Sequence, residues 1–118
     1  FIEKNPKAAE CIRQNLKTTH LEQKALVITS DVVVALKKLE GKEYCFDTIF
    51  MDPPYNNGYE EQVLRYLGTS SLLHNETLIV VEASLETDFS YVESLGFCIE
   101  KSKEYKTNQH VFLKKITE

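Results

Sequence analysis

An aspartate, two prolines and a tyrosine stand together as Asp52, Pro53, Pro54 and Tyr55, directly after the apolar run at residues 49–51. A carboxylate beside the carbonyl of a proline pair can accept both hydrogens of an exocyclic amine on a nucleobase, which aims the nitrogen lone pair at an electrophilic methyl group. The tyrosine ring offers a flat face on which a base that has left its helix can stack. The alternative interpretation is a plain proline turn that caps a strand. The placement after a buried strand favours an amine-binding loop, because ligands of open α/β sheets bind outside the carboxyl ends of the strands.

Two further acids end strands that we expect earlier in the chain. Glu3 ends the first strand, where a carboxylate can accept hydrogen bonds from ribose hydroxyls. Asp31 ends the next strand and could accept from an adenine amino group. Each acid alone is also explained as a favourable charge at a helix N-terminus. Together with Asp52, they form a set at the carboxyl ends of successive strands, which favours a nucleotide-binding site.

The hydrophobic pattern places these residues on alternating strands and helices. We expect strands over residues 1–3, 25–29, 46–51, 77–82, 97–105 and 110–115, with a turn at 107–108. We expect helices over residues 5–17, 59–70 and 88–95, and one capped by residue 30 or 31. Strand 46–51 reads as buried on both faces. The sequence therefore predicts an α/β fold, a three-layer sandwich with a mostly parallel sheet and a C-terminal antiparallel hairpin.

The composition is that of a soluble globular chain and predicts one domain over residues 1–118. Of its 118 residues 42% are apolar and 27% are charged, and no run approaches the ~18 apolar residues of a membrane span. The three cysteines are far apart, which predicts small core residues in a reducing cytoplasm rather than disulfides. The three histidines share no spacing typical of a metal site. With a net charge of −4, any contact with nucleic acid must use a local patch.

The segments 3–5, 30–31 and 46–55, with Gly58 after them, resemble those of the RsmD-type methyltransferases, bacterial enzymes that methylate the N2 amine of one guanine in 16S ribosomal RNA. The resemblance covers essentially the whole chain, including Val81-Glu82 and the closing hairpin. It implies a class I, Rossmann-like methyltransferase fold that uses S-adenosylmethionine. By that resemblance, Glu3 would hold the ribose, Asp31 and the backbone of Val32 the adenine, and residues 52–55 the target amine.

One part of the family pattern is missing from this sequence. The family's glycine-rich cofactor loop should precede Phe1, and the four glycines present are too far apart to form one. We therefore expect a domain that is incomplete at its N-terminus, lacking a strand between the one that ends at Glu3 and the one that ends at Asp52.

Two other functions stay open on the sequence. The D-P-P-Y element is shared with adenine-N6 and cytosine-N4 DNA methyltransferases, although the short chain leaves no room for their extra target-recognition domain. A non-catalytic domain that binds a nucleotide or a partner protein would explain the missing glycine loop. Lysines on the terminal hairpin could contact RNA, but solvated strand faces explain them as well.

Overall fold

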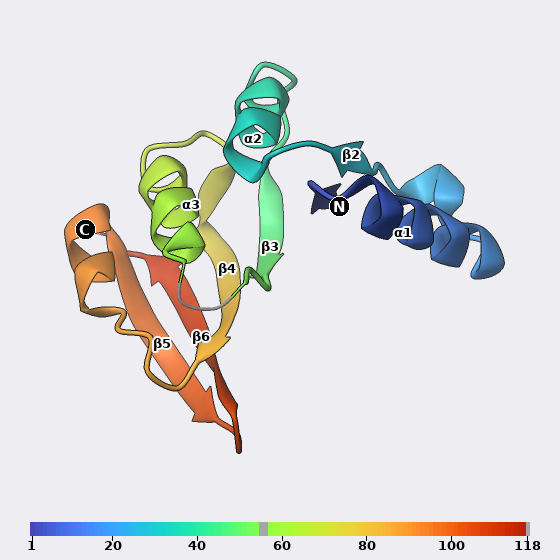
Figure 1. Ribbon diagram of the computed structural model, residues 1–118. Coiled ribbons are helices and arrows are strands. Elements are labelled where there is room, and N and C mark those ends of the chain that lie inside the picture. The colour runs from blue at the N-terminus through green and yellow to red at the C-terminus, as the bar shows by residue number, and fades with distance from the viewer. Residues whose placement is uncertain (55–56, 118) are drawn as a thin grey trace. The chain divides into compact units, whose positions relative to one another are not determined.

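The computed structural model describes residues 1–54 and 57–117 of the chain. It divides the chain into two compact units, residues 1–42 and 43–118. Each unit contains its own hydrogen-bonded sheet, with two strands in unit 1 and four in unit 2 among the described residues. Figure 1 labels their elements.

Unit 1 is a short parallel strand pair with a helix after each strand. Its elements are β1 (Ile2–Glu3), α1 (Pro6–Thr18), the 3-10 helix η1 (Glu22–Lys24), β2 (Ile28–Thr29) and α2 (Val32–Glu40). Ile2 lies opposite Ile28 and Glu3 opposite Thr29, so β1 and β2 run in parallel. Their carboxyl ends therefore lie at one edge, which is where the acids expected to bind the cofactor stand.

The first helix forms where its N-cap signal predicts it. The side chain of Asn5 accepts hydrogen bonds from the backbone N–H groups of Lys7 at 2.8 Å and Ala8 at 3.3 Å. Pro6 occupies the first helical turn, where its missing N–H leaves no hydrogen bond unmade. Ala9 and Leu16 form the buried side of the helix, as the spacing predicts.

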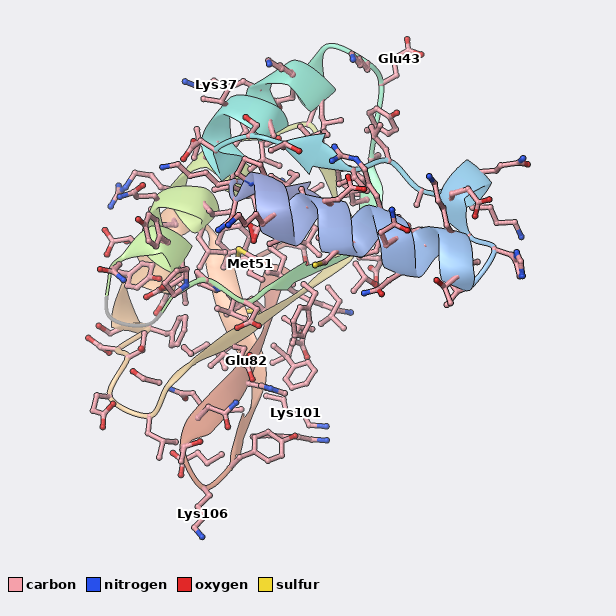
Figure 2. The ribbon with its side chains drawn as sticks, turned by 45° about the vertical axis from the view of Figure 1, so that its right-hand side comes forward. Lys37, Glu43, Met51, Glu82, Lys101 and Lys106 are labelled. Atoms are coloured by element: carbon pink, nitrogen blue, oxygen red, sulfur yellow. The ribbon has the colours of Figure 1, made fainter. Side chains whose placement is uncertain are left out.

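Unit 2 carries the loop with Asp52 and a four-stranded mixed sheet. Its elements are β3 (Phe46–Met51), α3 (Tyr59–Leu67), β4 (Leu73–Ser84), the 3-10 helix η2 (Ser90–Leu95), β5 (Phe97–Glu104) and β6 (Asn108–Lys115). The strand order is β3-β4-β6-β5, with β3 parallel to β4 and the other pairs antiparallel. The C-terminal hairpin predicted from the sequence is confirmed, and Figure 2 shows Lys106 at its tip.

The two faces of this sheet differ in burial. Ile79 and Val81 on β4 and Val111 and Leu113 on β6 are at most 1% exposed. The α3 side chains predicted to face the core complete the cluster and are also buried: Val63, Leu64 and Leu67. On the other face, Phe50 is 61% exposed. The expectation that strand 46–51 is buried on both faces is therefore wrong for the structure described, because Met51 is its only buried residue.

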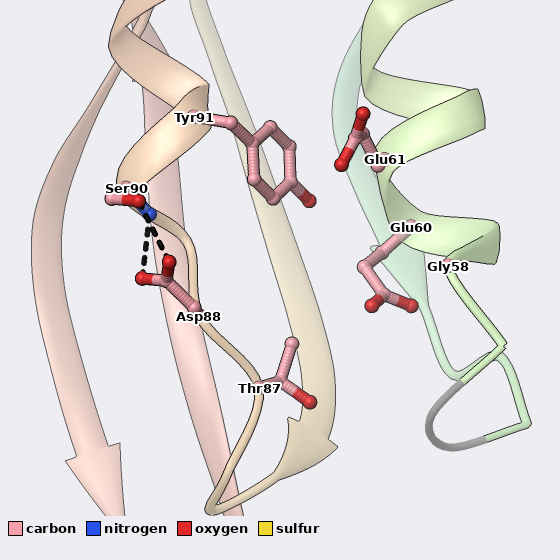
Figure 3. Close-up of a pocket in the computed structure, with 7 residues that line it drawn as sticks. All are labelled: Gly58, Glu60, Glu61, Thr87, Asp88, Ser90 and Tyr91. Carbon is pink, nitrogen blue, oxygen red and sulfur yellow. Dashed lines mark hydrogen bonds between the residues drawn. The ribbon is translucent and has the colours of Figure 1, made fainter.

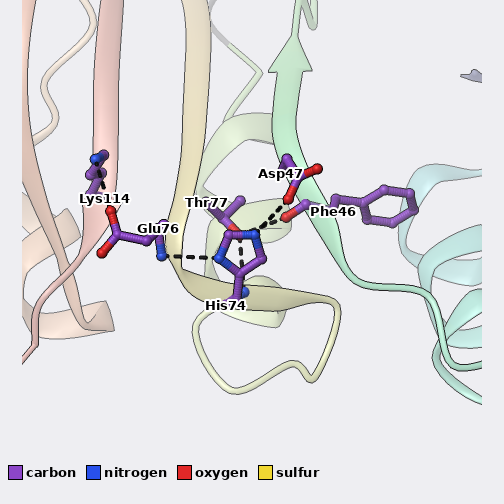
Figure 4. A network of polar contacts seen from close by, with 6 residues as sticks. All are labelled: Phe46, Asp47, His74, Glu76, Thr77 and Lys114. Carbon is purple, nitrogen blue, oxygen red and sulfur yellow. Dashed lines mark hydrogen bonds and ion pairs between the residues drawn. The ribbon is translucent and has the colours of Figure 1, made fainter.

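A polar network fixes the β3–β4 pairing at the start of β3 (Figure 4). The hydroxyl of Thr77 donates to the carbonyl of Phe46 at 2.6 Å and accepts from the N–H of His74 at 2.9 Å. His74 Nδ1 accepts from the N–H of Glu76 at 3.1 Å, which leaves Nε2 to donate to Asp47 Oδ1 at 2.8 Å. These bonds span the register shift between residues 46 and 48, after which the strands pair regularly to Met51.

Several element boundaries differ from those expected. β4 begins at Leu73 instead of residue 77, because Thr77 and His74 tie the polar stretch before the apolar run into the ladder. The helix predicted over residues 88–95 is a 3-10 helix that begins at Ser90. β2 is confined to Ile28–Thr29, and β6 already begins at Asn108. Strands 46–51 and 97–104 lie within a residue of their predicted bounds.

The prediction that the three cysteines lie in the core is also wrong. Cys11, Cys45 and Cys98 are all free and exposed, not small core residues. Their apolar sequence neighbours misled the prediction, because on a strand such as β5 adjacent residues point to opposite faces. Among the described residues, no helix is both long enough and apolar enough to cross a membrane.

The close approach of α3 to η2 generates a stability prediction. A Cβ added to Gly68, at the C-terminal end of α3, would lie 2.5 Å from the carbonyl oxygen of Leu95. Gly68→Ala should therefore lower the free energy of unfolding by about 1–3 kcal/mol, because backbone must move to admit the methyl group.

Gly41, at the end of α2, is the matched control, since nothing lies within 4 Å of its added Cβ. Gly41→Ala should leave the stability unchanged or raise it by up to about 1 kcal/mol. Denaturant unfolding of both variants measures the difference, and equal stabilities would contradict the close approach.

Candidate functional site

The loop predicted to bind an amine begins at the carboxyl end of β3, as the sequence indicates. Asp52 follows the buried Met51 directly and is itself exposed, Pro53 is half-buried and Pro54 is exposed. Tyr55, the residue predicted to stack on the base, lies outside the described residues. The described part of the loop thus presents a carboxylate to solvent at the edge of the sheet where ligands of this fold class bind.

Asp52 lies next to a second carboxylate, that of Glu82 near the end of β4. A hydrogen bond with Glu82 is the largest cause that raises the pKa of Asp52, and burial and repulsion by the Glu82 charge raise it further. The same hydrogen bond, together with one from His110, lowers the pKa of Glu82. When the pair binds one proton, the proton therefore resides on Asp52 and Glu82 stays ionised.

The hairpin strand β6 holds Glu82 in place. Asn108 Nδ2 donates to Glu82 Oε1 at 2.6 Å, and His110 Nε2 lies 3.3 Å from the same oxygen. The side chains of Glu82 and His110 are 23% and 27% exposed. Two aromatic rings flank the imidazole, those of Tyr105 at 4.9 Å and Phe50 at 6.4 Å between ring centroids. A carboxylate pair with a titratable imidazole behind it is equipped to bind and move protons.

Glu3 and Asp31, the acids predicted to bind the cofactor, both lie in unit 1. Glu3 ends β1 opposite its strand partner Thr29 on β2, and Asp31 follows two residues after Thr29. One Glu3 oxygen accepts from the N–H of Lys4 at 2.9 Å, a bond within the turn that follows the strand. The structure thus places Glu3 and Asp31 at the carboxyl ends of two paired parallel strands, which is where the sequence argument requires them.

Asp31 is also the N-cap of α2. Its Oδ2 accepts from the N–H groups of Val33 at 3.1 Å and Val34 at 3.3 Å. The interpretation of Asp31 as a helix cap is therefore confirmed. The cap does not exclude the second interpretation, in which Asp31 binds the adenine of the cofactor. Oδ1 takes no part in the cap, and neither does the N–H of Val32, so both stay able to meet an adenine edge.

A groove of about 550 Å³ opens between the start of α3 and the loop after β4 (Figure 3). Its walls carry Glu60, which is 6% exposed, and Glu61, which pairs with Arg65 at 2.9 Å. The hydroxyl of Tyr91 is buried there without a hydrogen-bond partner, and burial raises the pKa of Tyr91. The remaining lining residues are Gly58, Thr87, Asp88 and Ser90. The negative charge of this groove makes it unsuitable for a phosphate backbone.

The sequence argument missed part of the site. It quoted Glu82 only as part of a family pattern and assigned no role to Asn108 or His110. Glu82 could have been found by the reasoning that selected Asp52, since it also follows an apolar run, residues 78–81. The other two could not, because their proximity to Glu82 depends on the antiparallel register of β4 and β6, in which His110 lies opposite Glu82. Among the described residues, no group of three His, Cys, Asp or Glu side chains could hold a metal ion.

Solved structures of other proteins show which fold this is. A conserved hypothetical protein of Streptococcus pyogenes superposes with a TM-score of 0.85 at 24% identity, over 98% of this chain and 69% of that one. The "Putative methyltransferase yhhF" of Escherichia coli gives a TM-score of 0.80 at 23% identity, over 99% of this chain and 63% of that one. The fold is that of the class I methyltransferases, as the sequence predicts.

The sequence itself identifies the family. The family described as "Conserved hypothetical protein 95" matches residues 1–114, and the chain belongs to it. The Bacillus subtilis protein named "Putative rRNA methyltransferase YlbH" is 30% identical over 104 residues, which are 88% of this chain and 55% of that protein. The chain thus spans about half the length of this curated relative. The predicted resemblance to the RsmD-type methyltransferases is confirmed at the level of the family.

The unpartnered hydroxyl in the groove generates a prediction that a matched variant can check. Tyr91→Phe removes a buried hydroxyl that makes no hydrogen bond, so the free energy of unfolding should stay unchanged or rise by up to about 1 kcal/mol. Thr77→Val is the control, because the fully buried Thr77 hydroxyl makes two backbone hydrogen bonds. That variant should lose about 1–3 kcal/mol in denaturant unfolding. A comparable loss in Tyr91→Phe would show that its hydroxyl has a partner in solution.

Proposed function

We propose that the protein transfers the methyl group of S-adenosylmethionine to an exocyclic base amine, and that this amine is N2 of a guanine in 16S ribosomal RNA. The observation that carries the proposal is the position of Asp52, an exposed carboxylate at the carboxyl end of β3 that lies against a second carboxylate. Family membership and the relative named as an rRNA methyltransferase support an RNA substrate.

Unit 1 supplies the residues that would hold the cofactor. Glu3 would accept from the ribose hydroxyls, the free oxygen of Asp31 from the adenine amino group, and the N–H of Val32 would donate to the adenine ring. The fit rests on two observations, namely that the paired strands bring both acids to one edge and that the helix cap uses only one Asp31 oxygen. When bound, S-adenosylmethionine supplies an electrophilic methyl group on a sulfonium.

Unit 2 supplies the group that acts on the amine. The lone pair of an exocyclic base amine is conjugated into the ring, so the amine is a poor nucleophile. Asp52 and a carbonyl of the proline pair would accept its two hydrogens and draw the nitrogen toward tetrahedral geometry, which frees the lone pair. Tyr55 would stack on the base. In the described loop, Pro53 and Pro54 restrict the backbone and keep this carbonyl in a fixed direction.

The substrate class is tested by offering the protein 16S ribosomal RNA, the small ribosomal subunit and DNA with labelled S-adenosylmethionine. Digestion to nucleosides should place the label in N2-methylguanosine from RNA. Label in N6-methyladenine or N4-methylcytosine from DNA would replace the RNA substrate with DNA. Calorimetric titration covers the non-catalytic alternative, since cofactor binding without transfer to any of these substrates would favour it.

The role of Asp52 leads to a kinetic prediction. Asp52→Ala should lower the rate of methyl transfer by ~10²–10⁴, as for other groups that orient a reacting atom or accept its proton. Cofactor affinity should change little, because Asp52 would face the amine and not the ribose. Asp52→Asn keeps the shape and one acceptor but loses the charge, so it separates charge from geometry. Near-normal turnover in either variant would remove Asp52 from the mechanism.

The role of Glu3 leads to the opposite pattern. Glu3→Ala should weaken S-adenosylmethionine binding by about 1.5–3 kcal/mol, the range for hydrogen bonds to a charged group. The maximal rate at saturating cofactor should largely survive. Calorimetry and steady-state kinetics on one preparation give both values. A variant that binds the cofactor normally but cannot turn over would contradict this division of roles.

A further inference from the structure

We propose that Glu82, held by Asn108 and His110, is a positioning residue that makes Asp52 the acceptor of the proton released when the target amine is methylated. The inference rests on the proposed function and adds to it a residue and a step. It assigns a catalytic purpose to the terminal hairpin, whose strand β6 supplies both groups that hold Glu82.

The strand register brings the two carboxylates together. Met51, the last residue of β3, lies opposite Val81 in the parallel β3–β4 pair, so Asp52, which follows β3, and Glu82 on β4 come next at the same level. Because side chains alternate between faces, Asp52 and Glu82 project to the side opposite the buried pair before them. The ladder therefore brings the two carboxylates side by side.

The hairpin keeps Glu82 in its charged form. Both donors, Asn108 Nδ2 and His110 Nε2, address Oε1, and neither uses Oε2. Asn108 is itself fixed, since its carbonyl accepts from the N–H of Tyr105 at 2.8 Å. A carboxylate that accepts two hydrogen bonds resists protonation, and the pKa of Glu82 is lowered accordingly. The negative charge therefore stays on Glu82 and raises the proton affinity of Asp52.

The transfer reaction needs such an acceptor. The amine lone pair forms the new N–C bond while the C–S bond of the sulfonium breaks, and its electron pair remains on sulfur as a neutral thioether. The nitrogen then carries a positive charge and two hydrogens, and it loses one of them to the Asp52 carboxylate, which leaves a neutral secondary amine. An isolated aspartate is a weak base, and the neighbouring charge of Glu82 makes it a stronger one.

The groups around Asp52 and Glu82 influence the basicity of Asp52. Asp52 follows β3, while β6 contributes Asn108 and His110. On β5, Lys103 lies opposite His110 in the hairpin register. Protonated His110 lowers the pKa of both carboxyls. A positive charge on His110 therefore makes Asp52 a weaker base, which should slow the transfer.

Carboxyl and imidazole titrations by NMR test the pair without an assay of activity. In Glu82→Gln the neighbouring negative charge is gone, so Asp52 should lose its proton more easily and its titration midpoint should move to lower pH. Glu76→Gln is the matched control, because Glu76 lies on the same strand and pairs with Lys114 at 3.7 Å. It should leave the Asp52 midpoint unchanged. An Asp52 midpoint that is the same in the wild type and in Glu82→Gln would overturn the proposal.

The pH profile of methyl transfer gives the second measurement. In Glu82→Gln the acid limb should move to lower pH and the plateau should fall by about tenfold or more, with the KM for S-adenosylmethionine unchanged. Asn108→Ala, which keeps the Glu82 charge but removes one donor, should lower the plateau less. If Glu82→Gln fails to fold, Asn108→Ala carries the test, and an unchanged profile there overturns the role of the hairpin.

The two proposals fail in different ways. A wild-type protein that transfers methyl groups, with the same plateau and acid limb in Glu82→Gln, would contradict the role of Glu82 and leave the proposed function intact. A wild-type protein that transfers no methyl group to any base amine would contradict the proposed function. In that case the NMR titrations still decide whether Glu82 controls the protonation of Asp52.

Discussion

The parallel pairing of β3 with β4 is the constraint on which the candidate site depends. The Thr77 hydroxyl and the His74 imidazole lock the start of this pairing, and the ladder then carries the register to the carboxyl ends of both strands. A one-residue slip would turn Glu82 to the opposite face of the sheet and separate it from Asp52. The chemistry at one edge of unit 2 therefore depends on hydrogen bonds made near the other end of the same two strands.

Different physical signals predicted different parts of this fold. β3 and α3 were predictable because an uninterrupted apolar run and a helical apolar stripe each indicate an element, although the run overstated the burial of β3. The start of β4 was not predictable, because residues 73–77 join the ladder through side-chain hydrogen bonds that no hydrophobic pattern reveals. The exposed cysteines show the same limit, since a small apolar residue beside a strand can face either side.

The residues of the candidate site also differ in whether the sequence could predict them. Glu3, Asp31 and Asp52 were predictable because each stands at or just after the carboxyl end of a strand, and that position can be read from one segment of sequence. Asn108 and His110 contact Glu82 only through the folding back of the terminal hairpin, which joins residues 26 and 28 positions apart. How units 1 and 2 combine into one domain, and whether a further strand separates their sheets, remain predictions of the sequence argument.

The central claim is that Asp52 acts on an exocyclic base amine, and the atom that receives the methyl group tests this most directly. Ribosomal RNA methylated by the protein with isotope-labelled S-adenosylmethionine can be digested and each labelled nucleoside identified by mass spectrometry against synthetic standards. The account predicts that the label lies on an exocyclic nitrogen, as N2-methylguanosine. Label on a ring carbon, a ring nitrogen or a ribose oxygen would contradict it, because none of these atoms needs a carboxylate to free an amine lone pair.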